Sequence, residues 1–170
     1  VRDMTQKELR DKLGYVPQKG VLFSGTIDSN IRYGKPEITD AQVKEAAEVA
    51  QATEFIDTKP EKYESPVSQG GTNVSGGQKQ RLSIARAIAK DPEIFIFDDS
   101  FSALDFKTDS QLRKALKEYT KDATTVIVAQ RISTILGADQ IIVLDDGHMA
   151  GIGTHKELMA NCEVYQQIAR

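Results

Sequence analysis

The sequence predicts an α/β fold, in which a mainly parallel sheet is flanked by helices and a helical lobe is inserted. Three observations lead to this prediction. Apolar runs at 94–97, 126–129 and 141–144 each end at a polar residue, which is typical of strands buried on both faces of a parallel sheet. A segment of helical periodicity joins the first two runs, as in a strand–helix–strand crossover. The chain before residue 90 is richer in helical patterns.

The predicted elements follow in chain order. A first strand is expected at 13–16, and a helix from Thr39, where Thr39 and Gln42 match a capping box. A second helix is halted by Asp91-Pro92. The apolar positions of these two helices are Val43, Ala46, Ala47 and Ala50, then Leu82, Ala85, Ile88 and Ala89.

The rest of the chain continues the α/β pattern. The crossover helix covers 108–119, with Leu112, Leu116 and Tyr119 at helical spacing. After the run at 141–144, Asp146-Gly147 indicates a hairpin that leads into 149–152. We therefore expect an α/β core at 1–18 and 91–170 and a helical subdomain at about 19–90.

The composition favours a soluble intracellular domain. Of the 170 residues, 39% are hydrophobic and 28% are charged, which supports a packed core. The net charge of −3 argues against a nucleic-acid partner, which needs a basic surface. A single cysteine, Cys162, excludes an internal disulfide framework and a cysteine-rich zinc cluster. No apolar run approaches the roughly 20 residues that span a bilayer.

The most specific stretch, at 73–82, reads Asn-Val-Ser-Gly-Gly-Gln-Lys-Gln-Arg-Leu. Ser75 is a good N-cap, and Gly76 and Gly77 let another group approach the amides of the first helical turn. These amides lack intrahelical partners, so the helix start favours an anion such as a phosphate. An ordinary capped helix would explain Ser-Gly-Gly alone, but it fits the whole string poorly.

Two carboxylates, Asp98 and Asp99, follow the run at 94–97. Carboxylates at the carboxyl end of a central strand lie where open α/β sheets place ligands. In a nucleotide enzyme the first carboxylate would hold Mg²⁺ through the ion's water shell, and the second would act on the attacking water. A plain turn at Asp99 and Ser100 is the alternative reading, and the flanking segments argue against it.

Together these segments resemble the ATP-binding cassette (ABC) ATPases. The stretch at 74–78 is similar to the family's signature motif, 94–99 to its Walker B strand, and 102–105 to its D-loop. Gln18 resembles the Q-loop glutamine. The resemblance covers essentially the whole chain, in the family's order and spacing. Two further matching segments are the exporter-like 23–27 and the closing helix start at 153–158.

The resemblance implies a P-loop NTPase-like sheet and the cofactors ATP and Mg²⁺. The implied nucleotide-binding residues are Ser75, Gly76, Gly77, Gln78, Ser102 and Asp105. The implied metal-binding residues are Asp98 and Gln18, and the implied catalytic positions are Asp99, Gln130 and Gln18.

The sequence departs from the family at the phosphate-binding loop. No Gly-x-x-x-x-Gly-Lys-Ser/Thr string occurs, because the best-spaced pair, Gly71 and Gly76, is followed by Gly77 rather than lysine. The chain also opens at Val1 without methionine. We therefore expect the loop to lie upstream, in a longer polypeptide of which this is the carboxyl-terminal portion of a nucleotide-binding domain. Alone, the chain is expected neither to bind ATP tightly nor to hydrolyse it.

Two catalytic positions depart as well. Asp99 stands where the family usually has glutamate, and one methylene fewer withdraws the carboxylate by about 1.5 Å, which matters for a general base. Gln130 stands where the family has its switch histidine, and an amide carries neither a proton nor a charge. At 68–69, Ser-Gln replaces the Gly-Glu common in exporters.

These departures beside an intact signature resemble the degenerate half of a heterodimeric multidrug exporter. Cassette domains pair head to tail, so that each nucleotide lies between one domain's phosphate loop and the other's signature. Asp99 and Gln130 would then spoil this domain's own site, while 75–78 serve the partner's. The implied partners are a second nucleotide-binding domain and the coupling helices of a transmembrane domain. These helices would meet 19–23 at the cytoplasmic face of the cell membrane.

Two other functions stay open. A non-catalytic, ATP-binding regulatory module would also tolerate Asp99 and Gln130. A DNA-repair type of cassette ATPase is opposed by the acidic charge, by the absence of long heptads and by the segment at 23–27.

Overall fold

A parallel sheet of three strands organises the first of two compact units, 1–128 and the residues from 129 on. The computed structural model describes residues 1–169. The elements of the first unit are α1 (Gln6–Asp11), β1 (Leu13–Val16), β2 (Gly25–Thr26), α2 (Ile27–Ile31), α3 (Asp40–Val49), α4 (Thr53–Asp57), η1 (Lys62–Glu64), β3 (Pro66–Val67), η2 (Gln69–Gly71), α5 (Gly76–Ala89), β4 (Ile94–Asp98), α6 (Phe106–Tyr119) and β5 (Thr124–Val128). The sheet order is β1-β4-β5, with both pairs parallel, so the predicted fold class is confirmed.

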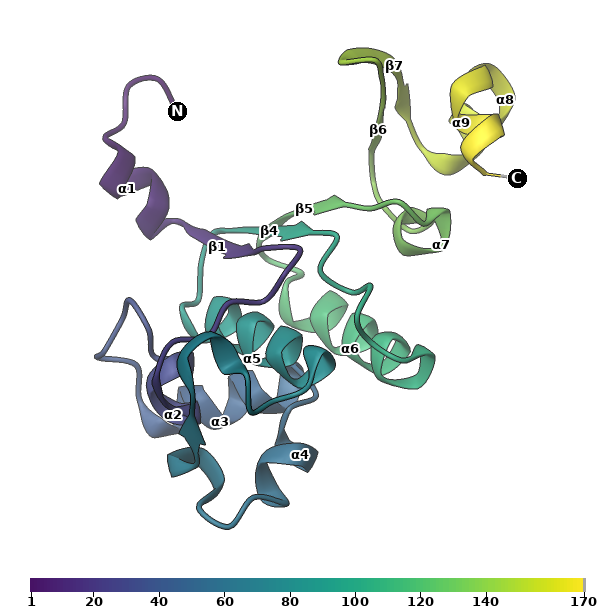
Figure 1. The fold of residues 1–170 in the computed structure, drawn as a ribbon. Helices are drawn as coiled ribbons and strands as arrows, with labels where there is room; N and C mark the ends of the chain where they lie inside the picture. Colours follow the sequence, from purple (N-terminus) through teal and green to yellow (C-terminus); the bar gives the residue numbers. More distant parts are fainter. Residues whose placement is uncertain (170) are drawn as a thin grey trace. The chain divides into compact units, whose positions relative to one another are not determined.

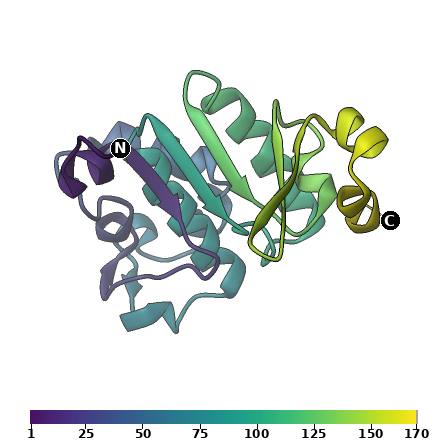
Figure 2. The same ribbon diagram turned by 90° about the horizontal axis from the view of Figure 1, so that it is seen from above.

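Helices of this unit cover one side of the sheet. Helices α2, α3, α5 and α6 lie on the same side of it (Figure 1), and the three strands lie side by side when seen from above (Figure 2). Burial along β4 therefore alternates: Phe95 and Phe97 are buried, whereas Ile94 and Ile96 are partly exposed. All five residues of β5 are exposed. The prediction that these strands are buried on both faces was wrong, since only one face of β4 is buried and neither face of β5 is.

Helix α5 lies at the centre of the core, with α2 and α3 packed against it. Its predicted apolar stripe is buried, and the helix ends at Ala89, before Asp91-Pro92 as expected. Helix α3 begins with the predicted capping box, in which Thr39 accepts from the Gln42 amide and Gln42 from the Thr39 amide. The predicted apolar positions of α3 and of the turn after it are also buried: Val43, Ala46, Ala47 and Ala50.

Helix α6 makes the predicted crossover from β4 to β5. It begins at Phe106, earlier than the sequence pattern indicated, because Asp105 serves as its N-cap. Leu112 and Leu116 are its buried residues. In the connection from β4, the ring of Phe101 packs on Phe97 with centroids 5.4 Å apart. This contact holds the segment after Asp99 against the core.

The second unit contains an antiparallel hairpin. Its elements are α7 (Ile132–Ile135), β6 (Ile141–Asp145), β7 (His148–Gly153), α8 (His155–Asn161) and α9 (Glu163–Ile168). The hairpin at Asp146-Gly147 is confirmed, and both residues have the positive φ that such a turn requires. In this unit β6 pairs with β7 in a sheet of two strands. That the run at 141–144 belongs to the parallel sheet stays a prediction.

The predicted subdomain boundary, at about 19–90, stays a prediction. Within residues 1–169, no helix combines the length and the hydropathy that crossing a membrane would take.

Candidate functional site

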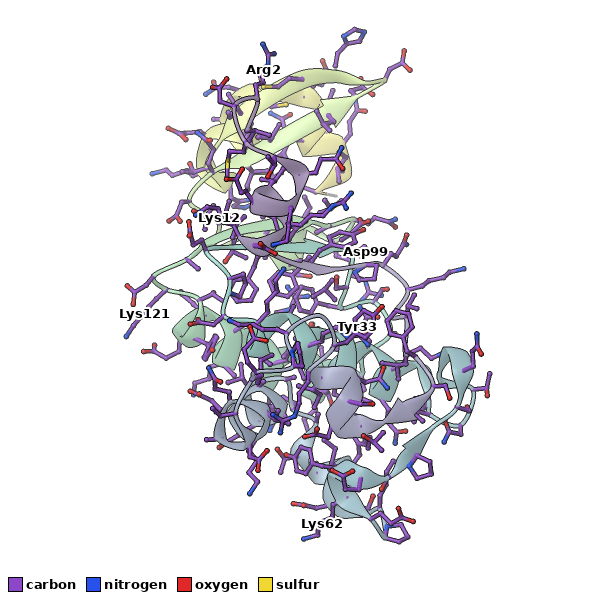
Figure 3. All side chains as sticks on the ribbon, turned by 90° about the vertical axis from the view of Figure 1, so that its left-hand side faces the viewer. Arg2, Lys12, Tyr33, Lys62, Asp99 and Lys121 are labelled. Atoms are coloured by element: carbon purple, nitrogen blue, oxygen red, sulfur yellow. The ribbon has the colours of Figure 1, made fainter. Side chains whose placement is uncertain are left out.

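Polar side chains converge at the carboxyl ends of β1 and β4. The two strands pair in register, with Tyr15 opposite Ile96. Parallel strands end at the same edge of a sheet, so Gln18 and Asp99 meet although 81 residues separate them. Gln18 Nε2 donates to Asp99 Oδ2 at 3.4 Å. Figure 3 labels Asp99 at this end of the strands and Lys12, which precedes β1, at the other.

The backbone of Asp99 has an unusual conformation. Its φ is 44°, in the left-handed region that aspartate and asparagine tolerate better than most residues. The Asp99 amide donates to Val128 O at 2.8 Å, and Ser102 Oγ donates to Asp99 O at 3.2 Å. Bonds from β5 and from the following loop thus hold the residue in this conformation. A strained residue held from two sides is a common feature of functional sites.

Tyr15 is a member of this site that the sequence analysis did not single out. Its hydroxyl donates to Asp98 Oδ2 at 3.3 Å. The pKa of Tyr15 is raised, first by desolvation and then by the charge of Asp98 and the hydrogen bond to it. The sequence contained a signal for this role, because Tyr15 lies three residues before Gln18 on a predicted strand, next to the strand that carries Asp98.

The chemistry of this cluster fits Mg²⁺. Asp98, Asp99 and the amide of Gln18 offer oxygen ligands, which are the ones that Mg²⁺ prefers. Mg²⁺ is commonly bound through one or two carboxylates together with substrate phosphates. The metal-binding roles predicted for Asp98 and Gln18 stay predictions, although the fold brings the two residues to the same strand ends.

The start of α5 forms a second polar site. Ser75 is the N-cap, with Gln78 N donating to Ser75 Oγ and Ser75 N to Gln78 Oε1, both at 3.2 Å. The amides of Gly76 and Gly77 have no acceptor among residues 1–169. A side chain at Gly76 would point into open space. Two free amides facing an open approach suit a phosphate group.

The segment 102–105 lies beside this helix start. A Cβ on Gly77 would lie 3.4 Å from Ala103 O. The exposed Asp105 caps α6 with its carboxylate, accepting from Thr108 N at 2.9 Å and from Thr108 Oγ1. These bonds, first the one from the Thr108 hydroxyl, lower the pKa of Asp105. Ser102 faces the Asp99 carbonyl instead, so this segment connects the two polar sites.

Gln130 lies in the second unit, two residues after β5 ends, and its side chain is exposed. Its predicted catalytic role stays a prediction. In the same unit, His155 Nδ1 and the buried hydroxyl of Tyr165 lie 2.8 Å apart, and Cys162 is buried between α8 and α9.

Two polar residues of α5 were also missed. Gln80 is 2% exposed and donates to Pro17 O at 3.2 Å. Arg86 donates to Val21 O at 2.9 Å and to Asn30 O, and burial lowers its pKa. The sequence did contain a signal for them. Each is a polar residue on the apolar face of the helix, and polar groups buried there are normally hydrogen-bonded.

The model of the family described as ABC transporter matches residues 1–102. The chain belongs to the ABC transporter family. It is 45% identical over 172 residues to an uncharacterized ABC transporter ATP-binding protein of Mycobacterium tuberculosis, covering 99% of this chain and 29% of that protein. It is also 45% identical over 168 residues to a putative multidrug export ATP-binding/permease protein of Staphylococcus aureus, with the same coverage.

A solved bacterial Atm1-family ABC exporter with ATP bound has the same fold as this ABC chain. The TM-score is 0.94 at 39% identity, over 99% of this chain and 29% of the exporter chain. The chain thus spans about a third or less of the relatives that it matches. The predicted resemblance to exporter-type ATP-binding domains is confirmed.

Proposed function

We propose that the chain is the carboxyl-terminal part of the ATP-driven motor domain of an ABC exporter. In this proposal ATP binding draws two such domains together, and the movement is passed to membrane helices. The protein matched in Staphylococcus aureus is named for multidrug export, which supports an export role. We place the domain at the cytoplasmic face of the membrane. The segment at 19–23 follows Gln18 directly and is the proposed contact for a coupling helix.

The start of α5 serves an ATP held by the partner domain. The free amides of Gly76 and Gly77 donate to phosphate oxygens, while Ser75 and Gln78 hold the helix start in shape by capping each other. The positive end of the helix dipole adds to this attraction. Ser102 and Asp105 keep the adjacent loop in place.

The strand-end cluster belongs to the chain's own ATP site. Asp98 and Gln18 would hold Mg²⁺ there, and the ion would supply positive charge to the phosphates. Tyr15 orients the Asp98 carboxylate. Asp99 stands at the general-base position and Gln130 at the switch position, and the shorter carboxylate and the uncharged amide make this site slow.

The observation that carries this proposal is the contact between Gln18 and Asp99. This contact joins residues from two distant segments at the sheet edge where open α/β sheets bind ligands. It also engages the Asp99 carboxylate in a hydrogen bond, and that side chain is one methylene shorter than the glutamate usual in the family. We therefore propose a heterodimer in which the complete site lies on the partner's phosphate loop.

The test is turnover by the intact transporter after changes at this site. Asp99→Glu combined with Gln130→His should raise total ATPase activity, at most about twofold, since a second working site is added. Asp99→Ala alone should leave most activity in place, because the partner's site carries it. Loss of most turnover in Asp99→Ala would refute the division of labour between the two sites.

A non-catalytic ATP-binding module is the second candidate, and Asp99 and Gln130 are the residues that favour it. ATP titration alongside hydrolysis measurements on the intact protein separates the two. Saturable ATP binding with no turnover, before and after Asp99→Glu with Gln130→His, would favour the module.

A further inference from the structure

The loop after β1, residues 17–23, is fastened to α5 by buried side chains. Gln80 lies about one turn into the helix that begins with the signature residues, and it is 2% exposed. Its Nε2 donates to Pro17 O, the carbonyl directly before Gln18, at 3.2 Å. A buried amide bonded to a loop carbonyl 63 residues away fixes that part of the loop against the helix.

The loop also lies flat against the helix at Gly20. A Cβ at this position would be 2.8 Å from Ser83 Oγ, 3.0 Å from Lys79 O and 3.1 Å from Gln80 Oε1. Contacts this short would force the neighbouring atoms to shift, and the Lys79 carbonyl belongs to the helix backbone, which yields less readily than a side chain. The glycine is therefore needed for close approach.

Arg86 fastens the far end of the loop. Its guanidinium donates to Val21 O at 2.9 Å and to the side chain of Asn30 at 3.0 Å. Asn30, itself 1% exposed, bonds to both the amide and the carbonyl of Phe23 at 2.8 Å. The loop is thus held to the same helix on both sides of Gly20.

We infer that Gln80 is a positioning residue that sets Gln18 against Asp99, so that α5 governs the chain's own ATP site as well as the one it offers to a partner. This inference rests on the proposed function. The path is short: Gln80 holds the Pro17 carbonyl, the next residue is Gln18, and its amide bonds to the Asp99 carboxylate. A shift of the helix start on binding a partner's nucleotide therefore moves the Gln18 side chain.

The first experiment measures hydrogen–deuterium exchange of the intact transporter. Gln80→Met keeps the length and burial of the side chain but removes the donor. Exchange at 18–23 should then rise about tenfold, the scale of one lost hydrogen bond, while exchange at 82–89 of α5 stays unchanged. Equal increases in both segments would show a general loss of helix stability and overturn the inference. An unchanged loop would overturn it as well.

Ser83→Ala is the matched control for this variant. Ser83 is 3% exposed on the same face of α5, and its hydroxyl bonds to the Lys79 carbonyl of its own helix. The change removes a buried polar group without removing a bond to the loop. Exchange at 18–23 should stay at the native rate. A rise equal to that of Gln80→Met would show that the loss of any buried polar group on this face loosens the loop, and it would overturn the inference.

Gly20→Ala tests the same contact from the other side. Its methyl group would press on the Lys79 carbonyl and on the side chains of Ser83 and Gln80, and so push the loop away although no residue of α5 is changed. It should raise exchange at 18–23 as Gln80→Met does. If Gln80→Met fails to fold, Gly20→Ala decides the question by the same criterion.

The second experiment is a double-mutant cycle on ATP turnover, in a transporter whose site on this chain has been made active by Asp99→Glu with Gln130→His and whose partner site has been inactivated, so that the turnover measured is that of this site. Gln80→Met should lower kcat at this site about tenfold and leave the KM for ATP within about twofold, since a displaced group loses rate rather than binding. Combined with Gln18→Ala, it should cause no further loss, because Gln80 acts through Gln18. Additive losses would overturn the inference.

The two experiments keep the inference apart from the proposed function. If Gln18→Ala itself leaves kcat unchanged, the assignment of the catalytic site fails, and with it the claim that Gln80 acts on catalysis. The exchange result still decides whether Gln80 holds the loop to α5.

Discussion

The two polar sites of the first unit are built in different ways. The start of α5 is made by residues 75–78 alone, and its reciprocal hydrogen bonds span three residues. The strand-end cluster draws on Tyr15, Gln18 and Asp98-Asp99, which meet only because β1 and β4 pair in register. The local site matches the family's pattern, whereas the long-range site contains the departure at Asp99.

This difference bears on what each site tolerates. A site made from one helical turn keeps its shape as long as its cap and glycines are present. A site assembled from distant segments depends on the sheet, on the left-handed backbone of Asp99 and on the loop that α5 holds. The first is therefore sensitive to substitutions that block ligand approach, and the second to substitutions that displace its parts.

The largest effect is expected from Gly76→Asp. The new carboxylate would enter the open space in front of the helix, where the proposal puts a partner's phosphates. Hydrolysis by the intact transporter should fall by about 100-fold or more, the scale seen when a stabilising amide site is lost. Folding should be unaffected, since an acidic residue in the first turn suits the helix dipole.

Gly137→Asp is the control for this change. Gly137 is also exposed, with open space where its side chain would be, and it lies in the loop before β6. The same substitution there should leave hydrolysis near the native rate. Equal losses in the two variants would mean that the helix start has no special role.

A smaller effect is expected from removing the cap itself. Ser75→Ala loses the bond from the Gln78 amide and should lower the free energy of unfolding by about 1 kcal/mol. Thr39→Ala removes a matching cap from α3, where the Gln42 amide also donates at 3.2 Å. Urea denaturation should show similar losses for both, and only Ser75→Ala should also lower ATP hydrolysis. A parallel loss of hydrolysis in Thr39→Ala would contradict this.

Local features of the molecule could be predicted from the sequence. The capping boxes at Thr39 and Ser75, the end of α5 before Pro92 and the turn at Asp146 all depend on residues within about one helical turn. Short-range chemistry is sufficient to specify each of them. The start of α5 was predictable for the same reason.

Long-range features could not be predicted in the same way. All of β5 is exposed, and the apolar pattern of 126–129 carries no information about which elements pack against a strand. The bond from Gln80 to Pro17 and that from Tyr15 to Asp98 arise from packing and register. The prediction did place Gln18 and Asp99 in one site, but through the family resemblance rather than through spacing.

A third prediction concerns the backbone of the strand-end site. At Asp99, with φ of 44°, glycine should be more stable than alanine by about 1 kcal/mol, because alanine pays the left-handed penalty. At Asp98, the last residue of β4, the order should reverse by about 0.5–1 kcal/mol, since glycine weakens a strand. Urea denaturation of the four variants measures both differences. The same order at both positions would show that Asp99 has no special conformation.

The smallest effect is expected at Asp105, the N-cap of α6 in the segment beside the start of α5. Stability in acid tests whether its neighbour Thr108 holds this carboxylate. Hydrogen bonds from Thr108 lower the pKa of Asp105 below its ordinary 3.8, so its ionised form stabilises the fold above that pH. The contribution is lost as the pH falls from about 4 through the lowered pKa. Asp105→Asn keeps an oxygen for the Thr108 amide but does not titrate, so stability should change little at neutral pH and fall less steeply in acid. Thermal unfolding followed from about pH 6 to about pH 2.5 measures this slope. An acid slope equal to the native one would mean that the Asp105 carboxylate is not held by Thr108.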